Sequence, residues 1–185
     1  MDHLIQAVLI FASVFLAFWL NDYRIAVSER QATERAVEAV ISEVTANREI
    51  LRRWAPYHGE MAERVLAWLE NEDRGDAPFS PYDYIDERGI FREILTYDSW
   101  DYLRQGDVRL DLDVRLSANR VFRQQEYVDR AVRATVEFLG SRELYDADRS
   151  YENAVIFYRH IADLHGQQVA MLESYNRFLE EVRAR

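Results

Sequence analysis

The feature that most constrains this chain is a stretch of 17 residues near its N-terminus that carries no charged side chain. Residues 4–20 read LIQAVLIFASVFLAFWL, and only Gln6 and Ser13 are polar. As an α-helix the stretch rises about 26 Å, close to the hydrocarbon thickness of about 30 Å that a transmembrane helix crosses. Because the stretch is apolar on all sides, it predicts a membrane-spanning helix rather than an amphipathic helix in the interface.

Two other structures compete for an apolar stretch of this kind. A buried core helix is usually shorter or amphipathic. A cleaved signal peptide has basic residues before its apolar stretch, and residues 1–3 contain none. The small-x-small pattern at residues 26–28 follows a polar segment, too far from the apolar stretch for a cleavage site. The sequence therefore predicts a transmembrane anchor at 1–21 and a helical bundle at 22–185.

The residues flanking the apolar stretch predict its orientation. Trp19 and Tyr23 lie where the aromatic belt of a membrane protein lies, and Arg24 can reach lipid headgroups. Arginines follow the stretch but do not precede it. The positive-inside rule then places the C-terminal part in the bacterial cytoplasm and the N-terminus outside the inner membrane. We expect Arg24 and Arg30 to contact anionic lipid.

Bulky side chains within the apolar stretch repeat at steps of three and four residues. Phe11, Phe15, Phe18 and Trp19 form this stripe, whereas spans that pair with themselves often carry small residues four apart. We expect the stripe to pack against lipid or against helices of other integral membrane proteins.

The remaining chain predicts an all-α fold in which the spanning helix continues into an antiparallel bundle with coiled-coil-like seams. Apolar residues at alternating steps of three and four predict helices at 22–54, ended by Pro56, and at 114–139, capped by Gly140. The same steps from Ala154 to Val182 predict a last helix of about 35 residues. Shorter helices are expected at 59–70 and 84–105, with a loop at 71–81. Residues 108–116 alternate like a strand, but no second strand is available to pair with them. The two shorter helices laid end to end match each of the three long helices in length. The resulting four columns predict an up-down-up-down bundle.

Each long seam contains one amide side chain, Asn47, Gln125 or Gln168. Such residues either form a buried polar layer that fixes the register of the helices or lie at a solvated edge of the seam. We favour the solvated edge.

Composition excludes several classes of chemistry. Cysteine and lysine are absent, which excludes thiol nucleophiles, cysteine-based metal sites, Schiff-base lysines and the phosphate-loop lysine. The net charge of −10 argues against nucleic-acid binding. The histidines His3, His58, His160 and His165 have no metal-ligand spacing and are expected at the surface or at the edge of the core. We expect no metal, no cofactor and no enzymatic activity.

An acidic and aromatic cluster follows the predicted loop, formed by Tyr82, Asp83, Tyr84, Asp86 and Glu87. It could be a docking patch for a basic partner. The commoner explanation is the first turn of a helix, where the helix dipole favours carboxylates. An enzyme that uses these carboxylates is a third, weaker hypothesis.

Three short segments form a recognisable pattern: the turn Trp19-Leu20-Asn21-Asp22-Tyr23-Arg24, then Ile41-Ser42-Glu43-Val44 with Asn47-Arg48, and later Trp100 and Gly106. On the first two, and more loosely on the third, the chain resembles a family of uncharacterised bacterial single-span membrane proteins. The resemblance covers the first third of the chain. It implies an N-terminal span followed by a helical cytoplasmic region, and it implies no activity.

These observations favour a non-enzymatic accessory or scaffold subunit that stabilises a larger inner-membrane complex, such as a photosynthetic or respiratory one. Its expected partners are membrane lipids and other integral membrane subunits. The alternative is a membrane-tethered signalling or defence module that forms a homo-oligomer through its helical seams.

Overall fold

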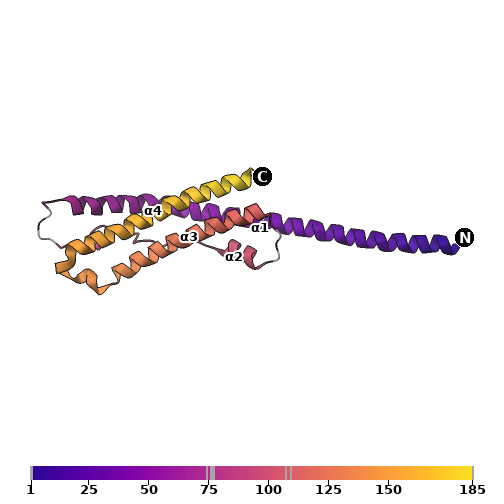
Figure 1. Ribbon diagram of the computed structural model, residues 1–185, viewed down its shortest axis with the longest axis horizontal. Helices are drawn as coiled ribbons and strands as arrows, with labels where there is room; N and C mark the ends of the chain where they lie inside the picture. The colour runs from indigo at the N-terminus through magenta and orange to yellow at the C-terminus, as the bar shows by residue number, and fades with distance from the viewer. Residues whose placement is uncertain (1, 74, 76–77, 107, 109, 185) are drawn as a thin grey trace.

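One helix, α1 (Asp2–Glu70), begins at the N-terminus and runs along the whole length of the molecule (Figure 1). The computed structural model describes residues 2–73, 75, 78–106, 108 and 110–184, and Met1 of the predicted anchor lies outside them. The other helices are α2 (Asp98–Gln105), α3 (Leu112–Leu139) and α4 (Ser150–Arg183), with 3-10 helices at Pro81–Asp83, Arg142–Tyr145 and Ala147–Arg149. No strand occurs in the described ranges, so the fold is all-helical, as predicted.

The prediction that Pro56 ends the first helix is wrong, because Pro56 lies inside α1. A proline within a helix removes one backbone hydrogen bond and costs about 3 kcal/mol. Pro56 itself faces solvent, while Trp54, Tyr57 and His58 beside it are buried and hold both halves of the helix against the core. The predicted helix at 59–70 is therefore the last part of α1.

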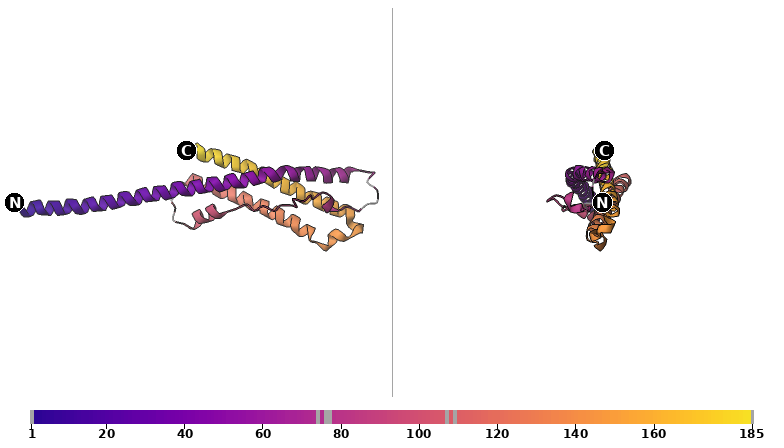
Figure 2. Two further views of the ribbon diagram at one scale, coloured as in Figure 1. Left: turned by 180° about the vertical axis from the view of Figure 1, so that it is seen from behind. Right: turned by 90° about the vertical axis from the view of Figure 1, so that its left-hand side faces the viewer.

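The helices α3 and α4 form a hairpin beside the C-terminal half of α1 (Figure 1). Figure 2 shows that the C-terminus lies at the end of this packed part from which the N-terminal half of α1 projects. We call the packed part the head; it contains α1 from Ala32 onward together with the other helices. Three long helices form its core, so the prediction of four matched columns is wrong.

The place expected for the fourth helix is taken by a mostly extended segment, residues 78–97, which we call the strap. The strap leads into the short helix α2. The predicted helix at 84–105 is thus confirmed only at its C-terminal end. The strap runs antiparallel to α1, whose side chains bind its backbone. Asn47 Oδ1 accepts from Thr96 N at 3.1 Å, Tyr57 Oη donates to Gly89 O at 3.0 Å, and His58 Nε2 lies 2.6 Å from Ile90 O. These bonds replace those that a helix would make within itself.

The seams predicted for α3 and α4 are confirmed by burial. Nearly every seam position of α4 is buried, from Ala154 and Phe157 to Phe178, and α3 is buried from Ala118 to Thr135 at the same spacing. Rejection of the strand at 108–116 is also confirmed, because Asp111 caps α3 by accepting a bond from Asp113 N at 2.9 Å. Gly140 caps the other end, where its N–H donates to Val136 O.

The three seam amides form buried polar contacts, so the solvated edge that we favoured is wrong. Asn47 is 1% exposed, and Gln125 and Gln168 are fully buried. Asn47 Nδ2 donates to Gln125 Oε1 at 3.2 Å, and the Tyr175 hydroxyl donates to the same oxygen at 2.5 Å. Gln168 lies in a second group, with its Oε1 2.8 Å from His58 Nδ1.

His58 is buried in the core, where the sequence predicted a surface or core-edge histidine. Its ring packs near Trp54, and burial lowers its pKa below the usual value. Gly59 follows it because α4 comes very close at this point. A Cβ atom at position 59 would lie 2.9 Å from the His165 ring.

Candidate functional site: the projecting part of α1

The N-terminal part of α1 projects from the head with no covering from the rest of the chain (Figure 2). Every side chain that the structure describes in residues 5–31 is exposed, including Phe11 at 74% and Phe18 at 67%. Apolar surface in water is unfavourable by about 25 cal/mol per Å², so a helix with this much of it requires an apolar environment. The helix is long and apolar enough to cross a membrane. The described side chains of residues 5–31 form no part of the core of the head.

The polar hydroxyl within this apolar stretch is satisfied by the helix itself. Ser13 Oγ donates to the carbonyl oxygen of Leu9 at 2.8 Å, the bond that a serine makes where no water is available. At the end of the stretch the Trp19 and Tyr23 rings stack, with centroids 6.0 Å apart. Side chains of this kind suit the boundary between an apolar phase and water. The structure leaves the stripe of Phe11, Phe15, Phe18 and Trp19 exposed along the helix.

Residues 21–31, which we call the stalk, join the apolar stretch to the head and are exposed throughout. They rise about 15 Å as a helix without any break. Arg24 and Arg30 both lie on the stalk, and Arg30 Nε donates to Glu34 Oε1 at 3.0 Å. The structure therefore places both predicted lipid-contacting arginines between the apolar stretch and the head.

The acidic and aromatic cluster lies on the strap. Tyr82 and Asp83 belong to the single turn of the 3-10 helix Pro81–Asp83, whereas Tyr84, Asp86 and Glu87 lie outside any helix. Tyr84 stacks on Phe79 with ring centroids 5.4 Å apart, and the Arg64 guanidinium lies over the Tyr84 ring. The Asp86 carboxylate accepts bonds from Arg88 at 2.6 to 3.1 Å. The remaining three, Tyr82, Asp83 and Glu87, are exposed, and Tyr82 Oη donates to Leu139 O at 3.4 Å. Three of the five residues thus make side-chain contacts within the chain.

Asp86 is expected to stabilise the fold in a pH-dependent way. The Arg88 guanidinium lowers the pKa of the Asp86 carboxyl from 3.8 to about 2. A lowered carboxyl pKa contributes stability above the unfolded value, and this contribution is lost as the pH falls toward 2. We expect Asp86→Asn to lower the urea midpoint at neutral pH, with the difference from the wild type disappearing as the pH falls through about 2. The control Asp83→Asn removes a nearby exposed carboxylate, and an equal loss there would contradict the role of the pair.

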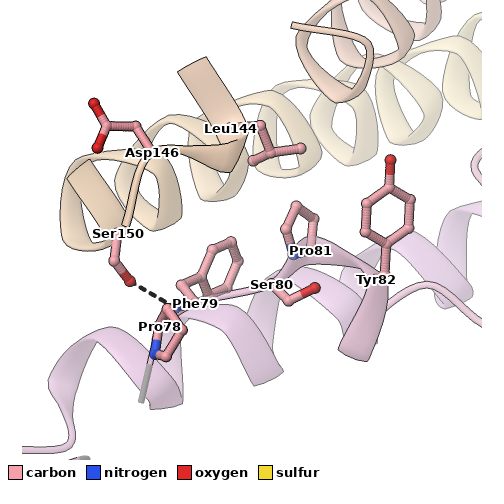
Figure 3. Close-up of a pocket in the computed structure, with 8 residues that line it drawn as sticks. All are labelled: Pro78, Phe79, Ser80, Pro81, Tyr82, Leu144, Asp146 and Ser150. Carbon is pink, nitrogen blue, oxygen red and sulfur yellow. Dashed lines mark hydrogen bonds between the residues drawn. The ribbon is translucent and has the colours of Figure 1, made fainter. Parts of the chain in front are cut away.

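A hollow of about 220 Å³ lies between the beginning of the strap and the segment just before α4, and Figure 3 shows the residues that line it. Its lining consists of Pro78, Phe79, Ser80, Pro81, Tyr82, Leu144, Asp146 and Ser150. Ser150 Oγ accepts a bond from Phe79 N at 2.6 Å and so holds the strap against α4. Within the described part of the chain, no three His, Asp or Glu side chains are grouped to hold a metal ion.

Comparisons with protein-family models, with curated proteins and with solved structures found no match. What the chain can do therefore follows from its own geometry. That geometry combines an apolar helix that the head leaves uncovered with a head whose polar core residues bind one another and the strap.

Proposed function

We propose that the chain is a single-span protein of the bacterial inner membrane that acts as a non-enzymatic accessory or scaffold subunit of a larger membrane complex. The observation that carries the proposal is the uncovered apolar helix at residues 5–20, joined to a folded head by a polar stalk. A lipid bilayer is the environment in which such a helix has all its surface and all its backbone bonds satisfied.

The arginines support the proposed orientation. Arg24, Arg30 and Arg35 follow the apolar stretch within the distance over which basic residues determine topology. This arrangement favours a cytoplasmic head and an N-terminus on the outer side. The resemblance to single-span bacterial proteins at residues 19–24 agrees with the same topology.

The bulky stripe supports a partner within the membrane. Phe11, Phe15 and Phe18 lie on one side of the helix, because residues three and four apart share a face. Leu9, Leu16 and Leu20 lie on the opposite side. The aromatic rings are confined to one side and provide a shape for packing against another helix, whereas lipid demands no particular shape. This asymmetry favours an accessory subunit over a simple anchor.

Purification in mild detergent tests the proposal. We expect the wild-type chain to be isolated with integral membrane proteins, and the triple variant Phe11→Ala, Phe15→Ala, Phe18→Ala to stay in the membrane but lose most of them. The matched control Leu9→Ala, Leu16→Ala, Leu20→Ala removes similar apolar surface from the opposite side and is expected to keep the partners. Loss of partners in both variants would contradict the role of the stripe.

Disulfide crosslinking distinguishes the proposed function from a homo-oligomeric module. The chain contains no cysteine, so Gln31→Cys introduces a single thiol on the exposed stalk. Disulfide-linked pairs of this variant in isolated membranes, with no other subunit present, would favour the homo-oligomer. Links to other proteins would favour the accessory subunit.

A further inference from the structure

A groove of about 350 Å³ lies between α3 and α4, on the head and away from the strap. Its lining includes the buried apolar residues Val121 and Phe178 and the exposed arginines Arg120, Arg123 and Arg177. We propose that this groove binds a small amphipathic anion, an organic carboxylate or phosphate with an apolar part. This binding site goes beyond the proposed function, and only the aqueous source of its ligand rests on the proposed membrane span.

The arginines reach the groove from both helices. Arg120 and Arg123 are three residues apart and share one face of α3, and Arg177 lies across from them on α4. Two side-chain bonds fix the register of the helices at this level. Ser117 Oγ donates to Glu181 Oε2, and the Tyr175 hydroxyl donates to Gln125 Oε1, each at 2.5 Å. Packed helices lie about 8–10 Å apart, so the three long side chains can bind one group between them.

The charge of the groove is opposite to that of the chain. Acidic residues outnumber arginines by 33 to 23, yet three arginines and a single carboxylate, Glu181, line the groove. The hollow between α2 and α3, which Arg123 also lines, is different, because Asp101, Glu126 and Asp129 line it together with Arg104 and Arg123. The residues described in the structure provide no ion pair for Arg120, Arg123 or Arg177. Unpaired guanidinium groups around a concave surface favour an anionic ligand.

The composition of the lining indicates more than a bare inorganic ion. Val121 and Phe178 provide apolar contact, while Ser174 and Tyr127 add hydroxyl groups to the wall. Sites for small organic molecules combine a mainly apolar surface with a few polar groups that fix orientation, and their volumes begin at about 300 Å³. We therefore expect the apolar part of the ligand to increase its affinity.

The height of the groove above the membrane argues for a soluble ligand rather than a lipid. Arg48 Nη1 donates to Asn176 Oδ1 at 3.4 Å, so Arg177 is nearly level with Arg48 along α1. The helix rises about 40 Å between Leu20 and Arg48, whereas the headgroup layer of a bilayer is only about 5–7 Å thick. A ligand in the groove must come from the aqueous phase.

Calorimetry on the full chain in nanodiscs of neutral lipid tests this inference, with phenyl phosphate as the probe. We expect saturable binding, weaker by about tenfold in Arg177→Gln and by a further similar factor when Arg120→Gln is added, because each substitution removes a charge-assisted hydrogen bond. Arg159→Gln makes the same charge change at an exposed position of α4 outside the groove and is expected to leave the affinity unchanged.

Three further results decide the inference. Inorganic phosphate is expected to bind more weakly than phenyl phosphate. Equal affinities would contradict a contribution of Val121 and Phe178 to binding. Anionic lipid in the nanodisc is expected to leave binding unchanged, and competition by it would overturn the soluble ligand. Absence of phenyl phosphate binding, or an equal loss in Arg159→Gln, would overturn the site itself.

Discussion

The double variant Ala12→Arg, Leu16→Arg is expected to move the chain from the membrane fraction into the soluble or aggregated fraction. Each arginine at the centre of a spanning helix costs about 2.5–3.5 kcal/mol of insertion free energy. Two of them cost about 6 kcal/mol, which changes the ratio of inserted to non-inserted chain by roughly 10⁴. Both positions lie in the exposed apolar stretch, so their replacement leaves the packing of the head intact.

Extraction of membranes with alkaline carbonate, followed by immunoblotting, measures this partition. The control variant Ser28→Arg, Gln31→Arg adds the same charge on the exposed stalk and is expected to remain in the membrane. An unchanged partition of the Ala12, Leu16 variant would contradict a spanning helix at residues 4–20. A wild-type chain that stays soluble and monodisperse without detergent would contradict it more directly.

The second large effect is expected at the buried polar layer. Asn47→Ala should destabilise the head by about 3 kcal/mol, because a buried polar group without a partner costs about 1–3 kcal/mol. The substitution removes the acceptor of Thr96 N and one of the two donors to Thr96 O, and it deprives Gln125 Oε1 of a donor. The strap would then lose its main attachment to α1 near Thr96.

Urea unfolding of the full chain in micelles, followed by tryptophan fluorescence, measures this loss. Tyr175→Phe removes only one donor from Gln125 Oε1 and is expected to cost about 1 kcal/mol. Gln31→Ala changes an exposed amide on the stalk and should leave the midpoint unchanged. A loss for Asn47→Ala no larger than that for Gln31→Ala would show that the polar layer contributes little to stability.

The long helices could be predicted from the sequence because their signals are local. The spacing of Phe157, Ile161 and Leu164 indicates one face of a helix wherever that helix packs, and all three are fully buried. Gly140 and Asp111 likewise act on the backbone next to them. Such features require no knowledge of which helix lies opposite.

The strap could not be predicted in the same way, because its conformation depends on residues far away in the sequence. Apolar residues such as Ile90 and Leu95 fit a helical pattern, but the bonds that hold the strap extended come from Asn47, Tyr57 and His58 of α1. Pro56 also led to a wrong prediction, because it was expected to end the helix that carries these residues. The seam of α1 continues past it through His58, Met61 and Val65, at the same steps of three and four.

The candidate sites also differed in whether they depend on local sequence or on distant residues. The projecting apolar helix could be read from composition alone, because it needs no partner within the chain. The ion pair between Asp86 and Arg88 and the packing of Tyr84 on Phe79 depend on how the strap folds. Similarly, the groove of Arg120, Arg123 and Arg177 exists only because α3 and α4 pack in one register.

The continuity of α1 from residue 5 to Glu70 has a mechanical consequence. No hinge separates the segment proposed to lie in lipid from the segment that forms the core of the head. The two segments therefore move together as one rigid body, and α1 acts as a lever. From Leu20 to Glu70 the lever is about 75 Å long. Membrane helices commonly tilt by about 20°, and half that tilt would carry the far tip sideways by about 13 Å. A neighbouring protein that changes the tilt of the span can thereby move the far end of the head by more than the width of a helix, about 10–12 Å.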